Sequence, residues 1–233
     1  LLGQIFPVLT SDGSNGAIVA WLDFRTGNPD VFGNRIDANG DIAAGWPAAG
    51  LALAVRDSFV IEVQTDTDGS GGAFIGFTEF FLSGTGYQDI YLQRVLGTGA
   101  IAGGWPAGGK KMNVGEIDSY AIRADGTGGA LVGWLDLNKQ GWLLRVNNAG
   151  NPAVGWPATG IPVGPAAASS IDFTPDGTGG FYAAWASTDS ILCTRYAANG
   201  TVASGWSSDG ATATAGGFFT GDVALARLTS GDL

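Results

Sequence analysis

The chain has 233 residues, of which 45% are hydrophobic and 40 are glycine, and its net charge is −10. This negative charge opposes binding to nucleic acids and to anionic membrane surfaces, because such binding relies on Lys and Arg neutralising phosphate charge. No apolar run reaches the ~18–20 residues of a membrane-spanning helix, so we expect no membrane insertion. Histidine is absent, which excludes His-based triads, His metal sites and His acid–base catalysis. The one cysteine, Cys193, excludes an intramolecular disulfide.

One pattern recurs four times with a period of about 50 residues. Each copy begins with an Asp-Gly pair, at Asp12, Asp68, Asp125 and Asp176. An apolar run follows and leads to an aromatic residue, at Trp21, Phe77, Trp134 and Trp185. A lone arginine comes next, at Arg35, Arg94, Arg145 and Arg195, and then a Gly-Trp pair ending at Trp46, Trp105, Trp156 and Trp206. Such a period indicates a repeat protein whose units bury their cores against one another.

Each copy predicts strands and tight turns. The apolar runs are Ala17–Leu22, Ala73–Phe77, Ala130–Leu135 and Phe181–Ala186. They are apolar on both alternating faces, which is typical of strands sandwiched between two other layers. Asp-Gly before such a run is a strong hairpin signal, and a second Gly turn precedes each Gly-Trp pair. We predict an all-β propeller with one four-stranded antiparallel blade per repeat; a β-solenoid would have shorter coils without paired hairpin turns.

The repeat boundaries define one propeller domain over residues 1–233. The four full copies are assigned approximately to residues 1–56, 57–114, 115–164 and 165–214, with a partial copy at 215–233. Within the partial copy, residues 222–228 resemble the opening strand of a fifth blade. We therefore expect a piece of a larger ring; a four-bladed ring closed by the tail is the alternative.

The repeat resembles a known class of propeller. Its columns read Asp-Gly-x-x-Gly, apolar run, Trp-x-Asp, Asp-Ile-Tyr-x-x-Arg and Gly-Trp-Pro-x-x-Gly, with the best copies at Asp12–Gly50 and Asp68–Gly109. In these columns the chain is similar to repeat β-propellers of large secreted or cell-surface bacterial proteins. The resemblance implies the fold and an extracellular or cell-surface location, but no activity. The spacing of a sialidase-type Asp box is absent.

Residues that recur in every copy are interpreted as structural. The repeated tryptophans are expected to fill the space between blades. Each arginine must be paired if it is mostly buried. Acids follow the apolar strand in three copies, at Asp23, Glu79 and Asp136, so we expect each arginine to contact an acidic or backbone acceptor near a blade edge. Cys193 is predicted to be a small buried hydrophobe.

Residues outside the repeated columns are the candidates for a functional site. The longest departure from the repeat lies between Glu79 and Asp89, where Phe80, Phe81 and Tyr87 could contact a ligand on a projecting loop. The alternative is that Phe80 and Phe81 cover a blade edge. A glycosidase-like carboxylate pair would draw on acids outside the columns, namely Asp189, Asp118, Glu116 and Glu62, but no spacing selects a pair.

One segment could bind calcium. Asp66, Asp68 and Ser70, followed by Gly71, match the first half of an EF-hand-like loop. Position 12 would be Phe77 instead of the required glutamate, and a hairpin turn explains the same residues. No other cofactor is predicted.

These observations predict a non-catalytic extracellular scaffold, adhesion or binding module with no catalytic residues. Its expected partners are a protein or glycan at the cell surface, together with further blades or domains of the same parent chain. The alternatives are a carbohydrate-active enzyme with a carboxylate pair in the central channel, and a lectin-like glycan binder.

Overall fold

The computed structural model describes residues 3–80, 88–165, 167–216 and 223–225. Within these ranges the regular structure consists of strands alone, arranged in four separate four-stranded antiparallel sheets. The described residues contain no helix that is long and apolar enough to cross a membrane. The predicted all-β fold with four-stranded antiparallel blades is therefore confirmed.

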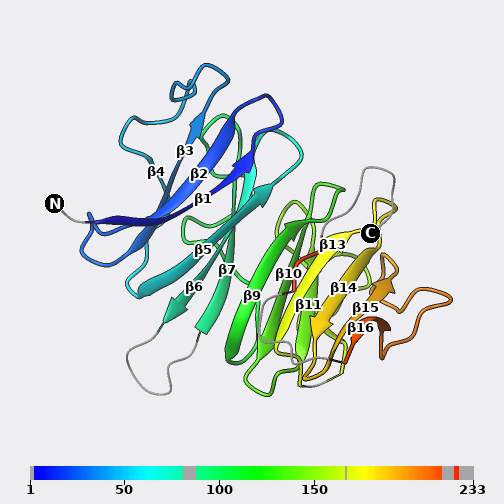
Figure 1. Cartoon of the computed structure of the whole chain (residues 1–233). Helices are drawn as coiled ribbons and strands as arrows, with labels where there is room; N and C mark the ends of the chain where they lie inside the picture. Colours follow the sequence, from blue (N-terminus) through cyan, green and yellow to red (C-terminus); the bar gives the residue numbers. More distant parts are fainter. Residues whose placement is uncertain (1–2, 81–87, 166, 217–222, 226–233) are drawn as a thin grey trace.

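The four blades follow the chain order (Figure 1). The first blade contains β1 (Gln4–Ser11), β2 (Ala17–Asp23), β3 (Asp30–Ile36) and β4 (Leu51–Ala54). The second contains β5 (Phe59–Thr67), β6 (Ala73–Phe80), β7 (Gln88–Val95) and β8 (Lys110–Lys111). The third contains β9 (Ile117–Ala124), β10 (Ala130–Asp136), β11 (Gly141–Val146) and β12 (Ile161–Val163). The fourth contains β13 (Ser170–Pro175), β14 (Phe181–Ala186), β15 (Ser190–Tyr196) and β16 (Ala211–Ala215).

The first strands of successive blades lie next to one another. Contacts join β1 to β5, β5 to β9 and β9 to β13, so these four strands form the inner edge of the array. The last strand of each blade, β4, β8, β12 or β16, pairs only with the strand before it and forms the outer edge. Blades stacked on a shared inner edge are the arrangement of a propeller.

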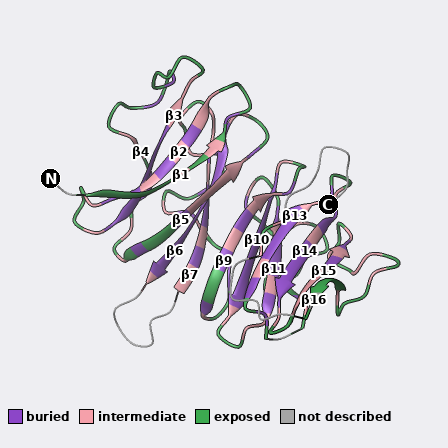
Figure 2. Cartoon of the chain, in the orientation of Figure 1, coloured by how far each residue is buried: buried purple, intermediate pink, exposed green. Residues whose placement is uncertain are grey.

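The core lies between blades, as the apolar runs predict. Three clusters of buried residues each combine side chains from two neighbouring blades; one joins Ile18 and Leu22 of the first blade to Ile75 and Phe77 of the second. Figure 2 shows the middle strands β6, β10 and β14 as largely buried. Strands with two apolar faces are stable here because each face packs against a neighbouring blade.

The two ends of the array are more exposed than its middle. β1 and the described residues of β16 are mainly exposed in Figure 2. In the aromatic column, Phe77, Trp134 and Trp185 are at most 1% exposed, whereas Trp21 of the first blade is only partly buried. Among the described residues, the first and fourth blades thus each lack a neighbouring four-stranded blade on one side. The repeat boundaries and the larger ring stay predictions.

Candidate functional site

The Asp-Gly turn of every blade is built around its aspartate. In the third blade, Asp125 Oδ1 accepts hydrogen bonds from the backbone N–H groups of Thr127 (2.7 Å) and Gly129 (2.8 Å). Gly126 has φ +74°, a value that glycine adopts without a Cβ clash. The same two backbone bonds recur at Asp12, Asp68 and Asp176.

The repeated arginine contacts the same aspartate. Arg145 Nε donates to Asp125 Oδ2 at 2.9 Å, and the equivalent pairs are Arg35–Asp12, Arg94–Asp68 and Arg195–Asp176. The expected acidic acceptor therefore exists, but it is the turn aspartate and not an acid following the apolar strand. The reason is the antiparallel register: Arg145 pairs with Leu131 near the start of β10, beside the turn, whereas Asp136 lies at the far end of that strand.

The acids after the apolar strands have other partners. Asp23 binds Arg25, and Glu79 binds Arg56 and Ser58. Asp136 accepts a hydrogen bond from Trp142 Nε1 at 3.0 Å. These acids therefore bind partners other than the repeated arginines.

Three of the four arginines also reach the next blade, together with the Gly-Trp tryptophan. Arg145 Nη1 (3.2 Å) and Trp156 Nε1 (2.9 Å) both donate to the backbone carbonyl of Ala198 in the fourth blade. The carbonyl of Gly97 accepts in the same way from Arg35 and Trp46, and that of Asn148 from Arg94 and Trp105. We call this arrangement, two donors on one blade and one carbonyl on the next, the inter-blade clamp.

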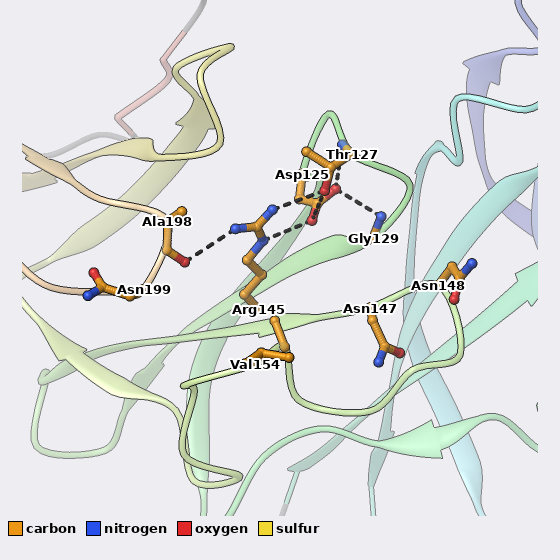
Figure 3. Close-up of a pocket in the computed structure, with 10 residues that line it drawn as sticks. Asp125, Thr127, Gly129, Arg145, Asn147, Asn148, Val154, Ala198 and Asn199 are labelled. Carbon is orange, nitrogen blue, oxygen red and sulfur yellow. Dashed lines mark hydrogen bonds and ion pairs between the residues drawn. The ribbon is translucent and has the colours of Figure 1, made fainter.

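A groove of about 530 Å³ between the third and fourth blades is lined by Asp125, Arg145 and Ala198 (Figure 3). In Figure 3, Arg145 lies between Asp125 on one side and the Ala198 carbonyl on the other. Burial alone would raise the pKa of Asp125, but hydrogen bonds from Thr127 and Arg145 outweigh it and hold that pKa below its usual value. The aspartate is thus kept as a carboxylate that pairs with arginine, which suits a structural role better than proton transfer.

A second pocket, of about 430 Å³, lies along the first strands of the last three blades. Its lining includes Glu62 of β5, Asp118, Tyr120 and Arg123 of β9, and Asp172 of β13. Two of the four predicted off-column acids, Glu62 and Asp118, therefore lie in one pocket. Asp189 is elsewhere, in the turn between β14 and β15, where it contacts Ser187 and Ser190.

Three charged groups of this inner pocket, Asp118, Arg123 and Asp172, form ion pairs. Asp172 pairs with Arg123 (2.7 Å) and also accepts a hydrogen bond from the backbone N–H of Leu225 (2.8 Å). Asp118 pairs with Lys139 at 2.7 Å. Burial, with a further contribution from Glu62, raises the pKa of Tyr120 well above its usual value. The pocket can offer hydrogen bonds to a polar ligand.

The aromatic candidates lie mostly outside the described residues. Phe80 ends β6 and is partly buried, whereas Phe81 and Tyr87 are in the undescribed segment 81–87. Their contact role stays a prediction. Cys193 is only partly buried, on β15, instead of fully buried, and burial raises the pKa of its thiol.

The calcium candidates take part in other interactions. Asp68 carries the turn and the pair with Arg94, and Asp66 accepts from the backbone N–H groups of Thr67 and Ala124. Ser70 is exposed at the turn. Over the described ranges, no three His, Cys, Asp or Glu side chains are grouped to hold a metal ion. Calcium binding at these residues stays a prediction.

Sequence reasoning missed the carbonyl acceptors of the clamp and the Arg123–Asp172 pair. Gly97, Asn148 and Ala198 share no side-chain type, because each contributes a backbone oxygen. Their one sequence signal is position, two residues before the turn glycine of each repeat.

Several solved structures resemble this chain in shape, at low sequence identity. No protein-family model and no curated protein matches the chain. Among solved structures, a protein of unknown function from Dyadobacter fermentans is 14% identical, with a TM-score of 0.49, covering 87% of this chain and 68% of that one. A thermostable family-43 glycoside hydrolase is 10% identical, with a TM-score of 0.43, covering 88% and 73%. A glycosyl hydrolase from Bacteroides ovatus is 9% identical, with a TM-score of 0.44, covering 87% and 70%. Similarities of this size carry no conclusion about activity.

Proposed function

We propose that the chain is a non-catalytic scaffold, adhesion or binding module, of the kind that repeat propellers form in large secreted or cell-surface bacterial proteins. The observation that carries the proposal is the use of the repeated charges. All four column arginines pair with turn aspartates, and three of them also bind a neighbouring blade. Charged groups that are paired in this way hold the blades together, and few charged groups remain available for catalysis.

The proposed location is extracellular or at the cell surface, and the proposed partners are proteins or glycans there. The acidic surface and the resemblance of the repeat support this location. Exposed turns held by a rigid blade stack are suitable positions for contacts with such partners.

A carbohydrate-active or glycan-binding role is the second candidate, and the inner pocket favours it. Glu62, Asp118 and Asp172 come from three different strands yet line one space. Two carboxylates about 5–10 Å apart are what glycoside hydrolysis requires. The ion pairs of Asp118 and Asp172 oppose a catalytic role, because an acid catalyst must hold a proton.

Incubation with a panel of polysaccharides separates these functions. Retention of the protein on each polysaccharide and the appearance of new polysaccharide chain ends are measured together. The proposal predicts no new chain ends with any polysaccharide. New chain ends that disappear in Glu62→Gln/Asp118→Asn, but persist in the control Asp189→Asn, would establish the enzyme and overturn the scaffold. Retention without cleavage, lost in the same double variant, would establish a glycan-binding module.

A further inference from the structure

The fourth blade carries the clamp donors without an acceptor. Arg195 Nε and Nη2 bind Asp176, and Nη2 also donates to Thr178. Over the described part of the chain, Arg195 Nη1 and Trp206 Nε1 have no hydrogen-bond acceptor, although their three counterparts all share one. Tyr182 lies beside both donors, 5.9 Å from Arg195 Cζ and 5.8 Å from the Trp206 ring, measured from its own ring centroid.

The face around these donors is apolar and open. Tyr182, Ile191 and Cys193 occupy the positions that Phe74, Ile90 and Leu92 hold in the second blade. The three second-blade residues are 0% exposed because the third blade covers them, whereas the fourth-blade residues are all partly exposed. The open donors and this face therefore match a surface that is buried in every earlier blade.

Residues 223–225 lie where the first strand of a next blade belongs. The N–H groups of Val223 and Leu225 donate to side-chain oxygens of Ser170 (3.0 Å) and Asp172 (2.8 Å) on β13. Between the second and third blades, Ile122 and Ala124 of β9 donate in the same way to Gln64 (3.2 Å) and Asp66 (2.7 Å) of β5. The inner edge thus continues past the fourth blade with the same type of contact.

The packing of the Gly-Trp tryptophans in the earlier blades indicates which groups a further blade would have to provide. A Cβ on Gly150 would lie 2.6 Å from the Trp105 ring, and one on Gly200 would lie 3.3 Å from the Trp156 ring. Each tryptophan therefore packs on the turn glycine of the next blade while bonding the carbonyl two residues earlier. At the opposite end of the array, the first-blade turn has this glycine, Gly40, with nothing within 4 Å of its would-be Cβ.

We propose that Arg195, Trp206, Tyr182 and Ile191 form a docking surface for a fifth four-stranded blade. Its first strand continues the inner edge at residues 223–225. Its turn between the third and fourth strands presents a backbone carbonyl to Arg195 Nη1 and Trp206 Nε1, with glycine two residues later beneath the indole ring. A second copy of the chain is a poorer occupant, because its β1 would need the inner position that residues 223–225 already hold.

The test supplies such a blade and measures protection of Cys193, the one cysteine of the chain. An extended chain joins residues 1–225 to a second copy of residues 125–163, which carries the Asn148 turn and no cysteine. We expect its Cys193 to react with a thiol reagent at least about tenfold more slowly than in the 233-residue chain. Trp206→Phe should lower the melting temperature of the extended chain and leave that of the 233-residue chain nearly unchanged.

Equal thiol reaction rates in the two chains would overturn the proposal. A second extended chain, with residues 12–54 after residue 225, controls for misfolding of the first. If neither extended chain protects Cys193, the docking surface is contradicted. Equal effects of Trp206→Phe in both chains would also overturn it. If the 233-residue chain protects Cys193 by itself, and does so only at concentrations where sedimentation shows a dimer, a second copy is the occupant and the fifth blade is wrong.

Discussion

The third and fourth blades carry the same aspartate, arginine and tryptophan, yet only in the third blade do the arginine and the tryptophan bind a neighbouring blade. Arg145 and Trp156 share the carbonyl of Ala198, whereas Arg195 and Trp206 have no equivalent acceptor in the described chain. The difference shows that the clamp is not a property of one blade. The turn aspartate of a blade holds the arginine of that blade in place. A backbone carbonyl of the next blade then completes the contact.

This comparison also explains why the turn sequences can vary. The acceptors Gly97, Asn148 and Ala198 differ in side chain, but each offers the same carbonyl two residues before a glycine. A backbone acceptor allows any residue whose carbonyl is oriented correctly. The glycine is required by its positive φ and by the indole ring that covers it.

The largest effect is expected from removing a turn aspartate at a closed clamp. Asp125→Ala removes the partner of Arg145 and the acceptor of two backbone N–H groups, so we expect the free energy of unfolding to fall by about 3–5 kcal/mol. Urea unfolding measures the loss. Asp37→Ala is the matched control, because Asp37 accepts two turn N–H groups but lies at an exposed turn and forms no ion pair with any described residue. Equal losses in both variants would contradict a role for the ion pair.

A glycine pair compares a turn covered by a neighbouring blade with the uncovered turn of the first blade. Gly40→Ala adds only the backbone strain of φ +86°, worth about 1–2 kcal/mol. Gly150→Ala has φ +71° and also forces Cβ against Trp105, which we expect to add about 1–3 kcal/mol. Thermal unfolding of both variants tests this difference, and equal shifts in melting temperature would show that the indole contact contributes nothing.

Acid should weaken the clamps through their aspartates. Hydrogen bonds from Thr178 and Arg195 outweigh burial and lower the pKa of Asp176, as happens at Asp125. A lowered folded-state pKa stabilises the fold above the unfolded pKa of about 3.9, and this stabilisation is lost as pH falls through the folded value. Urea unfolding between neutral pH and pH values below about 3 should therefore show falling stability. Arg145→Gln should show a shallower fall, and a parallel curve would contradict the role of Arg145.

The smallest effect is expected from calcium. The carboxylate of Asp68 already binds two backbone N–H groups and Arg94, so adding calcium or a chelator should leave the melting temperature unchanged. Differential scanning fluorimetry measures this. A rise in melting temperature that is lost in Asp66→Asn would instead establish the calcium site predicted from the sequence.

The blades were predictable because their signals are local. Asp-Gly turns and strands that are apolar on both faces depend on neighbouring residues and on a repeat visible in the chain itself. The partner of Arg145 was predicted only as an acid or backbone group, since the register that brings it to Asp125 is a tertiary property. Glu62 and Asp118 were recognised as off-column acids, but their shared pocket depends on which first strands adjoin, and no sequence spacing encodes that.

The most direct test of the account compares Trp105→Phe with Trp206→Phe in the 233-residue chain. Trp105 donates to Asn148 in the next blade, and losing that hydrogen bond should lower the free energy of unfolding by about 1 kcal/mol. Trp206 has no such acceptor in the described chain, so its variant should change stability by less than about 0.5 kcal/mol. That ordering in urea unfolding would support a clamp completed only by the next blade. Equal losses, or a larger loss at Trp206, would contradict it.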